Sequence, residues 1–359
     1  MEEYWNGEIK WFTPSEIGKT KYISDSDRHI TELGLKNSSA KLLPKDTILL
    51  SSRATVGEIS ITLTECSTNQ GFQSLITKND VDNDFIYYLI STIRNEFLRR
   101  SSGSTFLEIS KNEISKIPIN IPDLFEQNKI SNFFSAIDNK IEILEKKYKY
   151  YQEFKKYLMQ RIFSDQDDKL RFADYNEYSL KQILEKIENG FSGTQVNYET
   201  PFPVTRIETI SSGIINYNKV GFVDHIPERY LLKEGDILLT NINSIKWIGN
   251  SVYFDGKRVL YHGMNLMLLR SKKEINSKYL YYYITYNNNW FKKMACQAVN
   301  QASINKSTLE KFIVKIPDFE TQNNIANVLS LTDEKINRIS NQVDLTRKFK
   351  KGLLQQMFV

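Results

Sequence analysis

Five polar loops in this sequence contain the residue types that pair with the edges of nucleic-acid bases. They are "SSRATVG" from Ser51, "STNQG" from Ser67, "SSGST" from Ser101, "TNINSIKWIG" from Thr240 and "QAVNQAS" from Gln297. Asn and Gln can form two hydrogen bonds with adenine, and Arg can do the same with guanine. The residues that we predict to contact DNA are Ser51, Arg53, Thr55, Asn69, Gln70, Ser104, Thr105, Asn241, Asn243, Lys246, Gln297, Asn300 and Gln301. Loops rich in Asn and Ser are also ordinary turns, so residue type alone leaves both interpretations open.

Catalytic motifs are mostly missing from the sequence. It has no Gly-rich dinucleotide fingerprint, no nucleophile elbow and no Asn-Pro-Pro-Tyr-like tetrapeptide for methylating an exocyclic amine. Gly18-Lys19-Thr20 resembles the end of a phosphate loop, but Thr13 stands where that loop needs its first glycine. The stretch "IPDLFEQNK" places acids near a lysine, as nucleases do, yet its second copy, "IPDFETQNN", retains neither Glu126 nor Lys129. We therefore predict a chain that is not an enzyme and that holds no cofactor or metal ion itself.

The composition is that of an ordered protein without membrane or disulfide signals. Of the 359 residues 40% are hydrophobic, but no apolar run approaches the roughly 20 residues of a membrane span. The N-terminus lacks a signal-peptide pattern, so we expect a cytoplasmic protein. Cys66 and Cys296 are too few for a disulfide framework, and the three histidines have no zinc-ligand spacing. We expect buried thiols and ordinary surface histidines.

The elements that carry the polar loops occur twice in the chain. Residues 121–163 align without a gap on residues 316–358, and both copies contain Ile-Pro-Asp, Gln-Asn, Lys-Ile and Phe-Lys-Lys. The match extends upstream, where "ISKNEISKIPINIP" from Ile109 aligns with "INKSTLEKFIVKIP" from Ile304. The chain is long for one core, and the repeat indicates two copies of one plan, a variable domain followed by a helix.

Each copy of the helix has two rows of mostly apolar residues with a spacing of seven. In the first copy the rows are Ile130, Ile137, Leu144, Tyr151 and Leu158, and Phe134, Ile141, Tyr148 and Ile162. In the second copy they are Ile325, Thr332, Ile339, Thr346 and Leu353, and Leu329, Ile336, Val343 and Met357. Such seams are typical of coiled coils, and their equal length favours pairing with each other over packing into separate cores. Lys155 and Lys350 interrupt the seams at matching positions, where a lysine can fix the register or contact a partner.

Charge gives only weak support for nucleic-acid binding. Residues 128–163 contain eight basic and four acidic side chains, and residues 323–358 contain six and three. The two helices together thus carry a net charge of +7, whereas the whole chain carries +5. A protein that holds DNA by phosphate contacts alone is usually more basic, and solvated helix faces explain most of this charge.

The sequence predicts a mixed α/β fold of the α+β type with an internal two-fold repeat. Strand patterns occupy residues 46–52, 58–64, 72–77, 236–241, 250–254 and 265–270, and helical patterns occupy residues 84–100 and 278–294. The predicted boundaries are a first variable domain over 1–120, a helix over 121–163, a linker over 164–177, a second variable domain over 178–315 and a second helix over 316–359.

This plan resembles the specificity subunit of type I restriction-modification systems. The resemblance covers essentially the whole chain, and the Ile-Pro-x-x-x-x-Gln-x-x-Ile helix opening, present at Ile121 and Ile316, is its most specific part. It implies that each variable domain is a target recognition domain that reads one half of a split site in double-stranded DNA. It also implies that the two helices form an antiparallel coiled coil, the spacer that sets the distance between the half-sites.

The resemblance also implies partners and cofactors. Two modification (methyltransferase) subunits would dock on the spacer helices, and a restriction subunit with ATP-dependent nuclease and translocase activity would join that core. S-adenosylmethionine, ATP and Mg would belong to those partners and not to this chain. The residues predicted for the spacer and for subunit docking are Gln127, Ile130, Ile137, Ile141, Lys155, Gln322, Ile325, Ile336 and Lys350.

The beginning of the sequence departs from this family pattern. The second copy has an introductory segment, "YSLKQILEKIENGFSGTQ" from Tyr178, whose first-copy equivalent would fall at or before Met1. We therefore expect the first recognition domain to be N-terminally shortened. Two rival interpretations remain, a coiled-coil tether or adaptor whose variable domains bind protein partners, and a fused methyltransferase. The second would need a cofactor-binding domain, for which the spacing between the repeats leaves no room.

Overall fold

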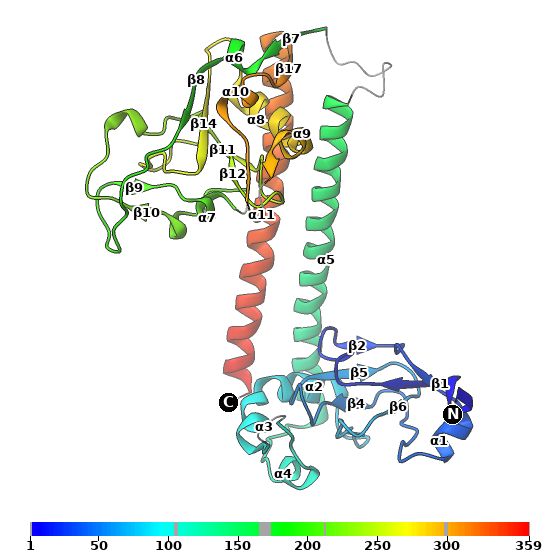
Figure 1. The fold of residues 1–359 in the computed structure, drawn as a ribbon. Coiled ribbons are helices and arrows are strands. Elements are labelled where there is room, and N and C mark those ends of the chain that lie inside the picture. Colours follow the sequence, from blue (N-terminus) through cyan, green and yellow to red (C-terminus); the bar gives the residue numbers. More distant parts are fainter. Residues whose placement is uncertain (1, 104–106, 165–173, 212, 298–300, 359) are drawn as a thin grey trace. The chain divides into compact units, whose positions relative to one another are not determined.

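The computed structural model describes residues 2–103, 107–164, 174–211, 213–297 and 301–358. The contacts within it divide the chain into two compact units (Figure 1). Unit 1 contains residues 1–146 and 340–359, and unit 2 contains residues 147–339. Each unit therefore combines one variable domain with segments of both long helices.

Unit 1 contains two small sheets beside the first long helix. Its elements are η1 (Glu2–Tyr4), β1 (Trp5–Phe12), β2 (Tyr22–Ile23), β3 (His29–Ile30), α1 (Glu32–Lys36), β4 (Ile48–Leu50), β5 (Ile59–Thr62), β6 (Ser67–Thr68), α2 (Asn83–Thr92), α3 (Arg94–Arg100), α4 (Lys111–Ser115) and the first part of α5 (Leu124–Phe163). The strand orders are β3-β1-β6 and β2-β5-β4. The apolar face of α2 packs against β5, and Ile48, Ile61, Phe85 and Leu89 belong to the core between them.

Unit 2 is built around a four-stranded sheet with the order β13-β11-β14-β8. Its elements are β7 (Tyr175–Ser179), α6 (Leu180–Ile183), β8 (Leu184–Asn189), β9 (Pro203–Val204), α7 (Ile207–Ile210), η3 (Tyr217–Lys219), β10 (Gly221–Phe222), η4 (Glu228–Tyr230), β11 (Ile237–Thr240), β12 (Ile242–Asn243), β13 (Ser251–Tyr253), β14 (Leu266–Ser271), α8 (Ser277–Tyr286), α9 (Asn288–Met294), β15 (Cys296–Gln297), β16 (Ala302–Ser303), α10 (Lys306–Leu309), β17 (Ile313–Pro317) and the first part of α11 (Phe319–Met357). The smaller sheets have the orders β12-β16-β15, β17-β7 and β10-β9. Helix α8 covers β13 and β14, and Leu239, Leu269 and Ile284 are fully buried in the core.

The predicted strands and helices are mostly confirmed, with two differences. Each predicted variable-domain helix is two helices, because the chain turns at Ile93 between α2 and α3 and at Asn287 between α8 and α9. Residues 72–77 form isolated bridges to Ile48 of β4 and to Ser51 and no regular strand, whereas the pattern over residues 265–270 forms β14, which is six residues long. The domain boundaries given above stay a prediction.

The two long helices pair antiparallel within each unit. In unit 1, Lys350 and Arg347 of α11 contact Asp138 and Glu145 of α5, so the residue numbers of one helix fall as those of the other rise. In unit 2, Asp333 and Lys335 of α11 contact Lys155 and Tyr151 of α5 in the same sense. The predicted seams supply buried residues to these pairs, namely Phe134, Ile137, Leu329, Thr332, Ile339 and Val343. Met357 is the exception, because its side chain is 41% exposed.

The repeated helix opening joins each long helix to the variable domain beside it. Gln127 is 1% exposed, and its Oε1 accepts a hydrogen bond from the backbone N–H of Asp82, the N-cap of α2. Gln322 is 2% exposed and accepts the same bond from Asn276, the N-cap of α8. Each glutamine also donates to the carbonyl of the proline five residues earlier. The glutamine is therefore a buried structural bridge within the chain, which explains why the motif occurs twice.

Two expectations about cysteine and histidine were wrong. Cys296 is exposed, whereas Cys66 is buried as expected. His262 is 1% exposed, and its Nε2 lies 3.0 Å from the carbonyl oxygen of Leu266. Burial lowers the pKa of His262 from 6.5 to about 4, so this ring is neutral at physiological pH.

Candidate nucleic-acid interface

The polar loops of the first repeat lie together in unit 1. The backbone N–H of Ser52 donates to the carbonyl of Gly71, which joins the loop after β4 to the loop after β6. Leu107 and Glu108, which follow the third predicted loop, reach the same place, because Ala54 donates to the carbonyl of Leu107 and Arg53 forms an antiparallel bridge with Glu108. The first two predicted loops, distant in sequence, thus lie together in unit 1 with Ser102, a described residue of the third loop that pairs with Glu108.

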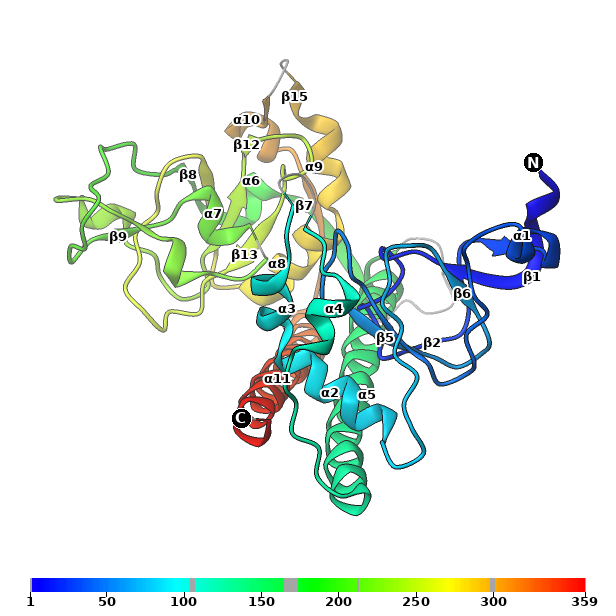
Figure 2. The same ribbon diagram turned by 90° about the horizontal axis from the view of Figure 1, so that it is seen from below.

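The polar loops of the second repeat meet in the same way in unit 2. Strand β12, from the loop after β11, pairs with β16, which in turn pairs with β15. Figure 2 shows β12 and β15 in the same part of unit 2, near α9 and α10. The backbone N–H of Ile304 also donates to the carbonyl of Asn241. Each unit therefore brings together the described parts of its predicted base-reading loops, where a rigid support can position them.

Several predicted contact residues present their side chains to solvent. Arg53 is 47% exposed and makes a 3.6 Å ion pair with Glu108, and Lys246 is exposed with its ammonium 5.1 Å from the ring centre of Trp247. Thr55, Gln70 and Gln301 are exposed as well. The loop that carries Arg53 has an unusual backbone, because Ala54 has a φ of +64°, a left-handed conformation that is rare for a residue with a Cβ. Such local strain is often found at functional sites.

Other predicted residues hold the loops in shape. Ser51 is fully buried and its hydroxyl contacts Thr55, and Asn241 is 4% exposed with its amide 3.4 Å from the side chain of Asn189. Asn69 and Asn243 are half-buried and accept hydrogen bonds from backbone N–H groups two and one residues later. These contacts are ordinary turn chemistry, the alternative that residue type had left open. The DNA contacts of all these residues stay predictions.

Four predicted residues cannot be placed in this interface. Ser104, Thr105 and Asn300 lie outside the described residues, and Gln297 is described only as a backbone position in β15.

Each unit also contains a polar network that joins both long helices to the variable domain. In unit 2 the Nζ of Lys155 lies 2.6 Å from Asp333, and the hydroxyl of Tyr282 in α8 donates to the same carboxylate at 2.8 Å. In unit 1 Lys350 and Tyr88 of α2 make the matching contacts with Asp138, at 2.5 and 2.7 Å. The lysines that interrupt the seams therefore pair with an aspartate of the opposite helix. Burial raises the pKa of Tyr88 and of Tyr282 well above the usual value, so both stay protonated donors.

Lys21 adds a contact that the repeat pattern did not indicate. Its Nζ lies 3.1 Å from Asp84 and 3.0 Å from the hydroxyl of Ser135, so it links the segment before β2 to α2 and α5. Burial lowers the pKa of Lys21, and the neighbouring carboxylate of Asp84 opposes that shift.

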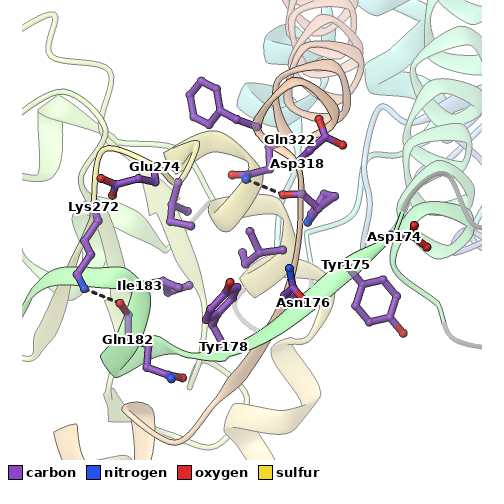
Figure 3. A pocket seen from close by; sticks show the side chains of 14 residues that line it. Asp174, Tyr175, Asn176, Tyr178, Gln182, Ile183, Lys272, Glu274, Asp318 and Gln322 are labelled. Atoms are coloured by element: carbon purple, nitrogen blue, oxygen red, sulfur yellow. Dashed lines mark hydrogen bonds between the residues drawn. The ribbon is translucent and has the colours of Figure 1, made fainter.

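A pocket of about 540 Å³ lies in unit 2 where β7 and β17 meet the start of α11 (Figure 3). On one side Lys272 donates a hydrogen bond to the backbone carbonyl of Gln182, at the end of α6. On the other side lie Asp318, the N-cap of α11, and the buried amide of Gln322. Within the described part of the chain, no cluster of three His, Cys, Asp or Glu side chains is placed to hold a metal ion. The described helices also include none that is long and apolar enough to cross a membrane.

Comparison with known proteins identifies the family. Residues 2–150 and 173–345 match the family model of the type I restriction modification DNA specificity domain, and the chain belongs to this family. A putative MjaX specificity subunit from Methanocaldococcus jannaschii is 40% identical over 193 residues, which cover 52% of this chain and 45% of that protein. The MjaIX specificity subunit of the same organism is 32% identical and covers 60% and 54%. The chain thus spans about half the length of these curated relatives.

Solved structures share the fold. The crystal structure of a type I restriction-modification S subunit from M. genitalium covers 100% of this chain and 94% of its own, with a TM-score of 0.64 and 17% sequence identity. A chain solved in work on assembly and conformational transition of the type I R-M system covers 99% and 95%, with a TM-score of 0.60 and 15% identity. The predicted fold class, two recognition domains with two long paired helices, is confirmed.

Proposed function

We propose that this chain is the sequence-specific DNA-recognition subunit of a type I restriction-modification complex. Each unit would read one half of a bipartite site in double-stranded DNA, and the long helices would fix the spacing between the halves. The observation that carries the proposal is that both units gather Arg, Lys, Asn and Gln side chains on loops beside equivalent sheets. Membership of the specificity-domain family supports the same conclusion.

The two units differ in the residues of these loops although they share one plan. Unit 1 presents Arg53 and Gln70, whereas unit 2 presents Lys246 and Gln301. Different side chains pair with different base edges. A protein of this kind would therefore read two unlike half-sites, and its target would be asymmetric.

Exposed apolar side chains on the long helices support docking of modification subunits. Matching positions of the repeat are all exposed, namely Phe133 and Val328, Tyr150 and Leu345, and Phe154 and Phe349. Unit 2 contributes Val328, Tyr150 and Phe154, and unit 1 contributes Phe133, Leu345 and Phe349. Exposed apolar side chains at matching positions of both repeats are candidates for an interaction surface. Because each unit carries one such set, two copies of the same modification subunit could bind in the same manner.

The chemistry would reside in these partners. In this proposal the modification subunits bind S-adenosylmethionine and methylate adenine, and a restriction subunit uses ATP and Mg to cleave DNA. The chain itself would act in the cytoplasm and supply only recognition and spacing.

The direct test of recognition is selection from random-sequence DNA by the chain assembled with its modification subunit. We expect enrichment of two short defined sequences separated by a constant gap of undefined bases. A variant with Leu345→Glu and Phe349→Glu should lose the modification subunit, whereas Arg99→Glu, at an exposed position of α3, should retain it. Enrichment of no sequence by an intact complex would contradict the proposal.

A further inference from the structure

The strands that lead into the predicted base-reading loops can be matched between the two units by their backbone hydrogen bonds. The carbonyl of Ser51, after β4, accepts a hydrogen bond from the N–H of Gly57, and the carbonyl of Thr240, at the end of β11, accepts one from Gly249. Both glycines have a left-handed backbone, with φ values of +83° and +77°. Ser51 and Thr240 therefore hold equivalent positions in the two units.

This match identifies a loop of unit 2 that residue type did not indicate. Ser51 forms a bridge with Phe72, and Thr240 pairs with Leu266, the first residue of β14. The four residues before Phe72 belong to the second predicted loop of unit 1. The four residues before Leu266, which are residues 262–265, correspond to them in unit 2.

The loop 262–265 is closely packed. The ring of His262 is buried, and a Cβ at Gly263 would lie 2.0 Å from the carbonyl oxygen of Thr205, so this position admits only glycine. Asn265 has a φ of +65°, a conformation that is rare for a residue with a Cβ. Such a backbone is often found at functional sites.

Arg206 lies beside this loop. The backbone N–H of Gly263 donates at 2.8 Å to the hydroxyl of Thr205, the residue before Arg206. In unit 1 the backbone N–H of Asn69 donates to the carbonyl of the residue before Thr13. Arg206 and Thr13 therefore hold equivalent positions beside the two loops.

Thr13 and Arg206 also begin equivalent turns, because the backbone N–H of each donates to a side-chain oxygen three residues later. In unit 1 this turn meets the first predicted loop as well, since the carbonyl of Pro14 accepts a hydrogen bond from the hydroxyl of Thr55. The position of Arg206 thus corresponds to the place in unit 1 where two predicted base-reading loops come together.

The guanidinium of Arg206 is held at one edge and unused at the other. Its Nε donates at 2.5 Å to Oε1 of Gln195, and both atoms lie against Gly221, where a Cβ would come within 2.6 Å of the Nε. The side chain is half-buried, and its two Nη groups form no hydrogen bond or ion pair with any described residue. A planar pair of free N–H donors in a fixed orientation matches the O6 and N7 acceptors of guanine.

We propose that Arg206 reads a guanine in the half-site of unit 2, and that Gln195 is a positioning residue that holds its guanidinium. The inference rests on the proposed function, because it names one base contact within a half-site that unit 2 reads. Thr13, at the equivalent position of unit 1, cannot form the same pair of hydrogen bonds. This position is therefore one source of the difference between the two half-sites.

The test is selection from random-sequence DNA by the chain assembled with its modification subunit. The wild-type complex should require guanine at one position of one half-site. Arg206→Lys keeps the charge but loses the planar fork, so the preference for that guanine should fall about tenfold while the overall affinity changes little. Arg206→Ala should lower both the preference and the affinity. The other half-site should be selected as by the wild type.

A second pair of variants tests the role of Gln195. Gln195→Ala should lower the guanine preference in part, whereas Gln195→Glu, which keeps the oxygen that accepts from Arg206, should retain it. A merely structural role would change the unfolding transition and leave the preference as it is. Lys273→Ala, at an exposed position beyond the other end of β14, is the control and should keep the wild-type preference and affinity.

The outcomes separate this inference from the proposed function. An unchanged guanine preference in Arg206→Lys and Arg206→Ala would overturn the inference and leave the proposed function intact. An equal loss of affinity for all sequences would also overturn it, because Arg206 would then contact phosphate. A wild-type complex that selects no motif would overturn the proposed function itself, and this inference with it.

Discussion

Phe163 and Phe358 hold the same position in the two repeats, and each packs into the variable domain of the other repeat. Phe163 ends α5 and lies 5.8 Å, ring centre to ring centre, from Tyr279 of α8. Phe358 follows α11 and lies 5.3 Å from Phe85 of α2. Each variable domain is therefore completed by the helix that belongs to the other repeat, which is why each unit contains segments of both helices.

Removing Phe163 should destabilise unit 2 selectively. The side chain is 9% exposed and contacts three tyrosine rings, so Phe163→Ala should lower the free energy of unfolding by about 3 kcal/mol. Hydrogen exchange should show faster opening of α8 than in the wild type. Phe125→Ala, at a side chain that is 71% exposed, is the control and should have little effect. Loss of protection in unit 1 alone would contradict this packing.

The ion pair between Lys350 and Asp138 should be needed for unit 1. Both side chains are mostly buried, at 21% and 31% exposed, and Tyr88 also donates to the carboxylate. Lys350→Ala leaves that carboxylate without its cation, which should cost about 1–3 kcal/mol of unfolding free energy. Lys348→Ala, at an exposed position of the same helix, should change it by less than about 0.5 kcal/mol. Urea unfolding measures both, and equal effects of the two variants would argue against the network.

Much of this architecture follows from the sequence. The apolar rows predict the paired helices, and the matching lysines within them indicate positions that fix the register or contact a partner. The pattern did not reveal that Lys155 and Lys350 pair with Asp333 and Asp138, because those aspartates lie beside the seam and only the folded geometry brings them together.

The candidate interface was only partly predictable. Loop composition singled out stretches whose described parts do meet within each unit, joined by backbone hydrogen bonds and bridges. Composition could not separate Arg53, which is exposed, from Ser51 and Asn241, which are buried within the same kinds of loop. Long-range packing decides that difference, and local residue type does not report it. The buried role of Gln127 was missed for the same reason, although its recurrence as Gln322 was the available signal.

Stability of unit 2 should fall between pH 6.5 and pH 4 because of His262. Burial lowers the pKa of this ring to about 4, so below pH 6.5 the unfolded chain binds a proton that the folded chain does not. This loss of stability is absent above pH 6.5 and approaches about 3 kcal/mol of unfolding free energy at pH 4.

The variant His262→Leu should remove this part of the pH dependence. Urea unfolding at several pH values gives the difference between wild type and variant, which cancels the titration of the carboxylates. His225→Gln, at an exposed histidine, should keep the wild-type profile. If His262→Leu kept the pH dependence of the wild type, the loss of stability at low pH would not come from His262.

The two sets of loops should affect different halves of the target. Arg53→Ala should relax the sequence preference of one half-site, or lower the affinity for it, and Lys246→Ala should do the same for the other. The binding free energy should weaken by about 1–3 kcal/mol where a bidentate base contact is lost, and by less where a phosphate contact is lost. Selection from random DNA by each variant complex measures this. Arg99→Ala, exposed and paired with Glu96, is the control and should leave the selected sequence intact. If both loop variants also left the site and its affinity unchanged, these residues would not read DNA.

The most direct measurement of the central claim is a map of every methylated adenine after this chain and its modification subunit are co-expressed in a host without other DNA methylation. Our account predicts one split motif, with two unlike halves and a constant gap, methylated throughout the genome. It also predicts that Arg53→Ala alters one half only. A complex that forms but methylates no defined motif would contradict the claim that the two units read DNA sequence.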